Sequence, residues 1–346
     1  MTMTNSHTDH SDIADTGRAA TMARYGTADD LTVGSRPTPS IATDEVLLAV
    51  DAAGVDAGVW HLMTGTPYLI RILGYGFRAP KQPVLGMDVA GRVLAVGADV
   101  TRFAVGDRVF GIANGSFADY AAAKETKLVA MPSNLTADEA AVSAVSGITA
   151  LQAVVDIAKV QEGQRVLVIG ASGGVGTFAV QIARALGAHV TGVGGSAGAP
   201  MMRSIGAERT IDYKTEDFVE DGVTYDAIID IAGRNSLRRL RRALAPKGTL
   251  VIVGGEGGNK LTGGIGRQLA AAILSPFLRQ RLAFFVSTEH YDYIERLATL
   301  LASGDVKPVV GRRFALEDAA DAIHHLENGE SSGKTVIVVA DDKTEG

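Results

Sequence analysis

Residues 165–193 are RVLVIGASGGVGTFAVQIARALGAHVTGV, and this stretch decides the fold class of the chain. Residues 165–169 form a short run of leucine and β-branched side chains, typical of a strand buried on both faces of a parallel sheet. An apolar stripe at helical spacing follows the glycines, and Gly187 is placed to end that helix. Residues 189–193 then supply the next parallel strand. The stretch therefore predicts the opening strand–turn–helix–strand unit of an α/β fold, a Rossmann doubly wound parallel sheet.

The turn between the first strand and the helix is crowded with glycine. Side chains there would keep the backbone away from a pyrophosphate, and the free N–H groups at the start of the helix point toward such an anion. The spacing is AxxGGxG rather than GxGxxG, but its place between a strand and a helix favours a dinucleotide site over a glycine turn without a ligand. The residues expected to contact the cofactor here are Ala171, Ser172, Gly173, Gly174, Val175 and Gly176.

The residues that end the second strand favour NADPH over NADH. An acidic side chain at this point would bind the ribose 2′-hydroxyl of NAD. Gly194, Gly195 and Ser196 stand there instead, so no carboxylate would repel a 2′-phosphate. Basic candidates for that phosphate are distant in the sequence, at Arg203 and Lys214.

Composition narrows the chemistry that the chain can perform. Its 346 residues are 46% hydrophobic and 21% charged, which indicates a globular protein of two domains. A net charge of −6 argues against nucleic acid or an anionic membrane surface as the main partner. Because the sequence contains no cysteine, it can form no disulfide, thiolate zinc site or cysteine nucleophile, so redox chemistry must come from a bound organic cofactor.

The chain outside the glycine turn divides into three regions. Residues 1–17 are polar and lack the basic start and apolar core of a secretory signal, so we expect a disordered leader and a cytoplasmic protein. Short strands punctuated by glycine continue to about residue 130, the pattern of a compact, partly antiparallel β domain. Beyond the glycine turn, strands and helices alternate as in a doubly wound sheet. Two of these strands end in residues that should approach the cofactor: Ala232, Gly233, Gly254 and Gly255.

Two segments invite other interpretations. The helical segment RNSLRRLRRAL, residues 234–244, carries Arg234, Arg238, Arg241 and Arg242 on one face, which we interpret as a solvated face rather than a nucleic-acid patch. The run QLAAAILSPFLRQRLAFFVS, residues 268–287, is the most apolar in the chain, but proline and arginine interrupt it and it is too short to span a bilayer. It predicts a subunit interface or the wall of an apolar substrate pocket.

Segments spread over residues 18–340 carry a family resemblance: VLGMDVAGRVLAVGADVTRFAVGDRVFG, GSFADYA, SGITALQA, GQRVLVIGASGGVGTFAVQIARALGAHV, IGAERTIDY and SSGKTVIVV. Together they resemble the medium-chain dehydrogenase/reductase superfamily, in particular its zinc-free quinone oxidoreductase branch. The resemblance implies a GroES-like β-rich catalytic domain made from residues 18–146 and 287–346. It also implies an inserted Rossmann dinucleotide-binding domain over residues 147–286, and a homodimer.

The resemblance bears on the metal and on the reaction. Zinc alcohol dehydrogenases of this superfamily use a Gly-His-Glu motif and cysteines, whereas the matching residues here are Gly86, Met87 and Asp88. We therefore expect no zinc, and without a metal to polarise a carbonyl, simple alcohol oxidation lacks its electrophile. Hydride transfer from NADPH to a quinone or an α,β-unsaturated carbonyl needs only hydrogen-bond donors and a proton source. The alternatives are an NAD(P)-dependent alcohol or carbonyl oxidoreductase, and a non-enzymatic NADPH-binding regulatory or RNA-binding protein.

The resemblance also implies roles for individual residues. In the active-site segment, Asp56 occupies the position of the family's asparagine near the nicotinamide, and His61 stands where some relatives have tyrosine. Tyr68 is a further candidate proton donor in the loop that follows. Positions that match cofactor contacts of relatives are Thr149 on the nicotinamide side, Ser196 and Tyr213 around the adenosine 2′-phosphate, and Lys334 in the Gly-Lys motif of the last strand.

Overall fold

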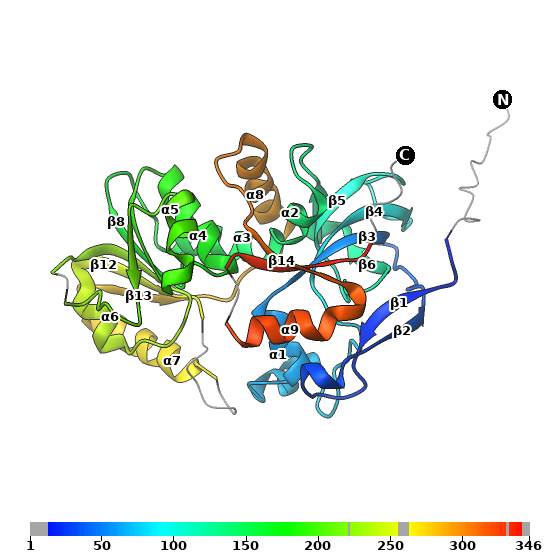
Figure 1. Ribbon diagram of the computed structural model, residues 1–346, viewed down its shortest axis with the longest axis horizontal. Helices are drawn as coiled ribbons and strands as arrows, with labels where there is room; N and C mark the ends of the chain where they lie inside the picture. The colour runs from blue at the N-terminus through cyan, green and yellow to red at the C-terminus, as the bar shows by residue number, and fades with distance from the viewer. Residues whose placement is uncertain (1–12, 221, 255–262, 330–331, 341–346) are drawn as a thin grey trace.

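Two β-sheets organise the chain, one in each of the two lobes that lie side by side in Figure 1. The computed structural model describes residues 13–220, 222–254, 263–329 and 332–340. No helix among these residues is long and apolar enough to cross a bilayer. Of the leader expected over residues 1–17, residues 1–12 lie outside the described residues, and Thr16 and Gly17 belong to strand β1 (Thr16–Thr21).

The first lobe contains a six-stranded sheet in which every neighbouring pair is parallel, in the order β10-β9-β8-β11-β12-β13. Its strands are β8 (Arg165–Ile169), β9 (His189–Gly194), β10 (Arg209–Asp212), β11 (Tyr225–Asp230), β12 (Leu244–Ile252) and β13 (Arg281–Phe284). The chain moves outward from β8 to one edge and then returns to build the other half. This is the predicted doubly wound sheet, and the fold class is confirmed.

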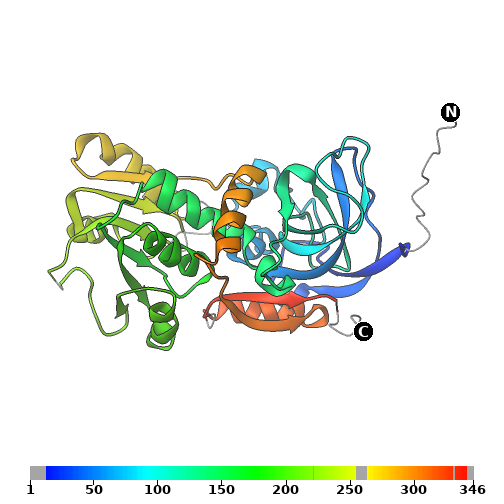
Figure 2. The same ribbon diagram turned by 90° about the horizontal axis from the view of Figure 1, so that it is seen from above.

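Helices cover both faces of this parallel sheet. The two views place α4 and α5 on one side of the strands and α6 and α7 on the other (Figure 2). Their bounds are α4 (Gly174–Ala185), α5 (Ala199–Ser204), α6 (Leu237–Ala243) and α7 (Ile265–Leu274). Helix α4 ends as predicted, because Gly187 adopts a left-handed φ of 79° that residues with a Cβ rarely take.

The second lobe is built from both ends of the chain. Its seven-stranded sheet contains β3 (Glu45–Val55), β4 (Asp88–Val96), β5 (Arg108–Ile112), β6 (Tyr120–Lys124), β7 (Leu128–Ala130), β14 (Val310–Ala315) and β15 (Lys334–Val338). The last strand pairs antiparallel with β3, placing Thr335 opposite Val55. A two-stranded ribbon of β1 and β2 (Thr32–Pro37) and the helices α1 (Ala57–Thr64) and α9 (Ala319–Glu327) complete the lobe. The C-terminal segment thus returns to the first part of the chain, as the GroES-like architecture requires.

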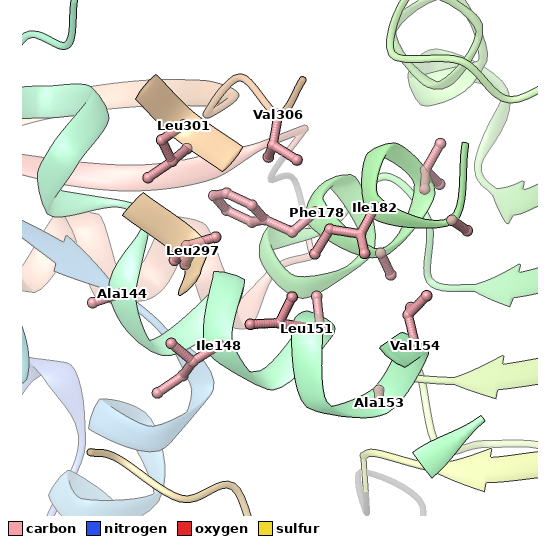
Figure 3. Close-up of a cluster of buried hydrophobic side chains, with 14 of the residues drawn as sticks. Ala144, Ile148, Leu151, Ala153, Val154, Phe178, Ile182, Leu297, Leu301 and Val306 are labelled. Atoms are coloured by element: carbon pink, nitrogen blue, oxygen red, sulfur yellow. The ribbon is translucent and has the colours of Figure 1, made fainter. Parts of the chain in front are cut away.

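A continuous apolar core joins the two lobes. Helices α3 (Ala144–Leu151) and α8 (Tyr291–Ser303) meet α4 there, and Figure 3 shows the Phe178 ring beside Leu297 and Leu301. The packing is close, because a Cβ added at Gly147 would lie 2.4 Å from a methyl carbon of Leu297. Burial of these side chains stabilises the junction by the hydrophobic effect and fixes α3 against the start of α4.

The helical connection between β7 and β8 is divided into three pieces. Helix α2 (Ala137–Ala141) begins with a capping box of Thr136 and Glu139. The chain leaves regular helix at Val142, restarts as α3, and continues as the π-helical segment η4 (Gln152–Ile157). This arrangement brings the start of α3 next to the glycine turn and the catalytic lobe.

Candidate active site

The glycine turn lies at the carboxyl edge of the parallel sheet, between β8 and α4. Gly170 has a left-handed φ of 89°, and Ala171 N–H donates to the Val193 carbonyl at 3.0 Å. A Cβ at Gly176 would lie 2.0 Å from the Gly170 carbonyl oxygen, so the turn requires glycine there. A Cβ at Gly173 would meet only that oxygen among the atoms of the described residues, at an ordinary contact distance of 3.6 Å. Open space at Gly173 next to the first N–H groups of α4 fits a pyrophosphate.

The residues predicted at the adenosine end lie around the end of β9. Tyr213 N–H donates to the Gly194 carbonyl at 3.2 Å, and a Cβ at Gly195 would contact the Tyr213 ring. Ser196 is exposed, and the Tyr213 side chain is 59% exposed. The Lys214 ammonium lies 5.9 Å from the centroid of the Tyr213 ring, so a basic residue stands close to the predicted 2′-phosphate position. The structure brings Ser196, Tyr213 and Lys214 into one neighbourhood.

Lys334 lies between the glycine turn and the catalytic lobe. Its side chain is buried and forms an ion pair with Asp88, which is fully buried, while the Asp56 Oδ2 atom is 3.6 Å from its ammonium nitrogen. A Cβ at Gly174 would lie 3.5 Å from Lys334 Cδ. Lys334 therefore passes beside the turn, as a cofactor-contacting residue would, and its charged end is already held by two carboxylates.

Burial and ion pairing have opposite effects on the pKa values of Asp88 and Lys334. Burial raises the pKa of Asp88 to about 6, although the Lys334 cation and the Val145 N–H both act to lower it. Burial alone would lower the pKa of Lys334, but the charges of Asp88 and Asp56 outweigh it and the pKa is raised. Both shifts are compatible with an ion pair at neutral pH, because Asp88 is then ionised and Lys334 protonated.

The three predicted catalytic residues lie along α1 and the loop after it. Asp56 caps α1, and its Oδ1 atom accepts from the Val59 N–H at 3.1 Å. The Nδ1 atom of His61 lies 2.7 Å from the Thr66 carbonyl oxygen. Because a carbonyl only accepts, Nδ1 must carry the proton, and His61 can supply a proton from Nε2 only as an imidazolium ion.

Tyr68 stacks against an arginine. Its ring centroid lies 4.6 Å from the Arg71 guanidinium carbon, and Tyr25 lies on the same guanidinium at 4.4 Å. Arg71 also donates to the Gly65 carbonyl at 2.8 Å, which ties the loop after α1 to the helix end. The structure pairs Asp56 with Lys334, His61 with Thr66 and Tyr68 with Arg71, rather than joining the three to one another.

Thr149 and the sheet-edge residues complete the predicted set. The Thr149 hydroxyl donates to the Val145 carbonyl at 2.7 Å, one turn earlier in α3. Ala232 N–H donates to the Ile169 carbonyl at 3.2 Å, and Gly233 has a left-handed φ of 69°. Gly255 lies outside the described residues. The roles of all these residues stay predictions.

An arginine that the sequence analysis missed fixes the sheet edge beside the predicted cofactor contacts. Arg267 of α7 donates to Asp230 Oδ2 at 2.5 Å and to the Asn235 carbonyl at 2.9 Å. It also donates to the Gly254 carbonyl at 2.8 Å. Asp230 is buried, and its other oxygen accepts from the Gly233 N–H at 3.3 Å. Burial raises the pKa of Asp230 despite the arginine. Arg267 thus joins the ends of β11 and β12.

The arginine-rich helix lies at another part of the surface. Arg238, Arg241 and Arg242 line a hollow of about 370 Å³ together with Arg279, Pro246, Leu278 and Gln280. On the opposite side of the same helix, Leu240 is buried in the core. This fits the interpretation of an amphipathic surface helix with a solvated basic face.

Comparisons with known proteins agree with this architecture. The family model for an alcohol dehydrogenase GroES-like domain matches residues 42–133, and that for a zinc-binding dehydrogenase matches residues 205–337. A 2-methylene-furan-3-one reductase of Solanum lycopersicum is 30% identical, covering 92% of this chain and 78% of that protein. The quinone oxidoreductase from Coxiella burnetii superimposes with a TM-score of 0.82 at 26% identity, covering 94% of this chain and 100% of that one. A mycobacterial protein complexed with NADPH gives a TM-score of 0.78 at 25% identity, covering 93% and 99%.

The parallel dinucleotide sheet and the GroES-like lobe beside it define a two-domain NAD(P)H-dependent oxidoreductase. The chain belongs to the medium-chain dehydrogenase/reductase superfamily, in its quinone oxidoreductase-like branch. The family and the enzyme class predicted from the sequence are confirmed.

Proposed function

We propose that the protein reduces a quinone or an α,β-unsaturated carbonyl compound with NADPH and without zinc. The observation that carries the proposal is the Asp56–Lys334–Asp88 cluster beside the open glycine turn. A lysine ammonium stands between the carboxylates that a metal ion would need. Met87 and the absence of cysteine leave no thiolate and no histidine in the matching motif.

Conjugate reduction needs a hydride, stabilisation of the charge that the hydride brings, and a proton. When bound, NADPH supplies the hydride. A quinone or enone spreads the arriving charge into a hydroquinone anion or an enolate, so the protein must supply hydrogen-bond donors and a proton rather than a Lewis acid. His61 as imidazolium and the Tyr68 hydroxyl are the candidate proton sources.

Three further observations support the cofactor and substrate classes. Lys214 and Tyr213 lie at the end of β9, where no acidic residue stands, which favours NADPH over NADH. Exposed apolar side chains follow α1, among them Ile72 at 72% and Phe77 at 73% exposure, which suits a bulky apolar substrate. The similar proteins include a quinone oxidoreductase and a 2-methylene-furan-3-one reductase. A cytoplasmic location stays a prediction.

Turnover with a small acceptor panel tests the proposal. Protein treated with a chelator is expected to oxidise NADPH in the presence of a simple quinone, a linear enone or a cyclic enone, and more slowly with NADH. A saturated aldehyde is the control, because its reduction needs an electrophile for the carbonyl oxygen. Turnover of the aldehyde alone, or a requirement for added zinc, would favour the alcohol or carbonyl oxidoreductase alternative.

We also propose that the protein is a homodimer joined along the edge of the parallel sheet. Strand β13 is the last strand of that sheet, and exposed apolar side chains gather on β13, on the residues just after it, on α7 and on the turn that follows α7. These are Leu269, Ile273, Leu274, Phe277, Phe284 and Val286. So much exposed apolar surface in one region marks an interaction site.

Sedimentation should give a dimer mass for the wild-type protein and a monomer mass for Phe277→Asp, because Phe277 is 84% exposed and would be buried in the interface. The matched control is Phe77→Asp in the other lobe, whose side chain is 73% exposed. A dimer that survives Phe277→Asp but not Phe77→Asp would place the interface on the catalytic lobe.

A further inference from the structure

Three charged side chains share the buried junction beside the glycine turn, and their charges do not cancel. The side chains of Lys334, Asp88 and Asp56 are 3%, 0% and 10% exposed. One ammonium therefore faces two carboxylates in a region largely closed to water. Above pH 7 the Asp88 carboxyl is ionised, since its raised pKa is about 6, and one negative charge is left in excess.

The excess charge resides on Asp56. Both oxygens of Asp88 are engaged, Oδ1 by the Val145 N–H at 2.7 Å and Oδ2 by Lys334. Asp56 differs, because among the described residues only its Oδ1 atom accepts a hydrogen bond, from the Val59 N–H. Within this part of the chain its buried Oδ2 atom has no hydrogen-bond donor and lies 3.6 Å from the Lys334 nitrogen, beyond the length of a hydrogen bond. An unsatisfied buried carboxylate oxygen calls for a positive or hydrogen-bonding partner.

The cluster adjoins the path of the dinucleotide. Gly333 N–H donates to the Ser172 carbonyl of the glycine turn at 2.9 Å, and the stem of Lys334 passes beside Gly174. Lys334 then leads from the turn to the start of α1, where Asp56 lies. A dinucleotide with its pyrophosphate on the turn extends across the carboxyl edge of the sheet, and its nicotinamide half faces the catalytic lobe.

We propose that the excess negative charge of Asp56 makes this site hold the oxidised cofactor more tightly than the reduced one. The nicotinamide ring is neutral in NADPH and carries a positive charge in NADP⁺. A nearby carboxylate without full compensation stabilises only the cationic form, because charge–charge attraction is strong where water is excluded. The inference rests on the proposed NADPH-dependent function and adds that Asp56 determines the redox form preferred, which favours hydride donation to the substrate.

The ratio of the dissociation constants for NADP⁺ and NADPH measures this effect without any substrate. NADPH is titrated by its own fluorescence at about pH 8, and NADP⁺ by displacement. Asp56→Asn is expected to raise the NADP⁺/NADPH ratio of dissociation constants by about tenfold, the effect of a unit charge several Å away at an intermediate dielectric constant. The amide oxygen of asparagine can still cap α1, so the fold is retained.

A charge-matched variant separates electrostatics from structure. Lys334→Met together with Asp88→Asn removes one positive and one negative charge and keeps the excess on Asp56. Its NADP⁺/NADPH ratio of dissociation constants should stay near or below that of the wild type. Asp88→Asn alone cancels the excess negative charge and should raise this ratio.

Equal changes in both dissociation constants of Asp56→Asn would overturn the inference and leave Asp56 with a structural role as a helix cap. So would a ratio that does not follow net charge across the three variants. If neither NADPH nor NADP⁺ binds the wild-type protein, the proposed function fails and the inference falls with it. Binding of both forms with an unchanged ratio refutes the inference alone.

Discussion

Valine in place of Gly173 is expected to lower the affinity for NADPH by on the order of a hundredfold without unfolding the protein. A Cβ at this position would meet no atom of the described residues closer than 3.6 Å, so a side chain can begin there without a clash at Cβ. The same space is where the pyrophosphate should approach the N–H groups at the start of α4. Loss of two hydrogen bonds to a charged group, at about 1.5 kcal/mol or more each, accounts for a change of this size.

Titration of NADPH fluorescence and thermal unfolding together check this prediction. Gly34→Val is the matched control, because a Cβ added at Gly34 would meet no atom of the described residues within 4 Å, and its strand β2 lies in the other lobe (Figure 1). Neither affinity nor melting temperature should change in that variant. Undiminished affinity in Gly173→Val would mean that the pyrophosphate does not lie on this turn. Gly176 is unsuitable for this purpose, since its Cβ would collide with the Gly170 carbonyl and damage the turn itself.

The sequence predicted the parts of this site that depend on local pattern. The glycine turn was recognisable because a buried strand, closely spaced glycines and an amphipathic helix follow one another within residues 165–185. The end of β9 could also be interpreted from the sequence, because the sequence alone shows that no acidic residue stands at Gly194 or Gly195. Lys334 was indicated by the family resemblance of the Gly-Lys motif, and its contact with the cofactor stays a prediction.

The partners of those residues were not predictable, because the fold brings them together from distant positions. Asp88 was noted only as a departure from a zinc motif, and its pairing with Lys334 joins residues 246 positions apart. No spacing rule links Arg267 to Asp230, which lie on α7 and at the end of β11. A lone arginine before an apolar run resembles an ordinary surface residue. Two signals were present: a carboxylate that ends a buried strand, and a lysine that opens a buried strand whose other residues are Thr-Val-Ile-Val. Each predicts that a partner of opposite charge must exist, but not which one.

Methionine in place of Arg267 is expected to lower the free energy of unfolding by about 3–5 kcal/mol and to weaken NADPH binding. The cost of removing one member of a buried ion pair is of this size because the remaining charge loses its compensation. Here Asp230 is fully buried, and the carbonyl groups of Asn235 and Gly254 lose their donors at the same time. The ends of β11 and β12 would then be free to separate, and the predicted cofactor contacts of both ends would be displaced.

Denaturant unfolding and NADPH titration of matched variants distinguish the loss of these Arg267 contacts from a general loss of positive charge. Arg24→Met is the control, since the Arg24 side chain is 79% exposed and its change should alter neither quantity. Arg267→Lys should recover part of the stability, because an ammonium keeps the charge but cannot reach three acceptors in the way a planar guanidinium does. Adding Asp230→Asn to Arg267→Met should reduce the loss of stability, because the buried charge is removed with its partner.

If Arg267→Met has the same free energy of unfolding as Arg24→Met, the contacts of Arg267 do not hold the sheet edge. If Arg267→Met loses stability but binds NADPH normally, the contacts of Arg267 stabilise the fold without affecting cofactor binding.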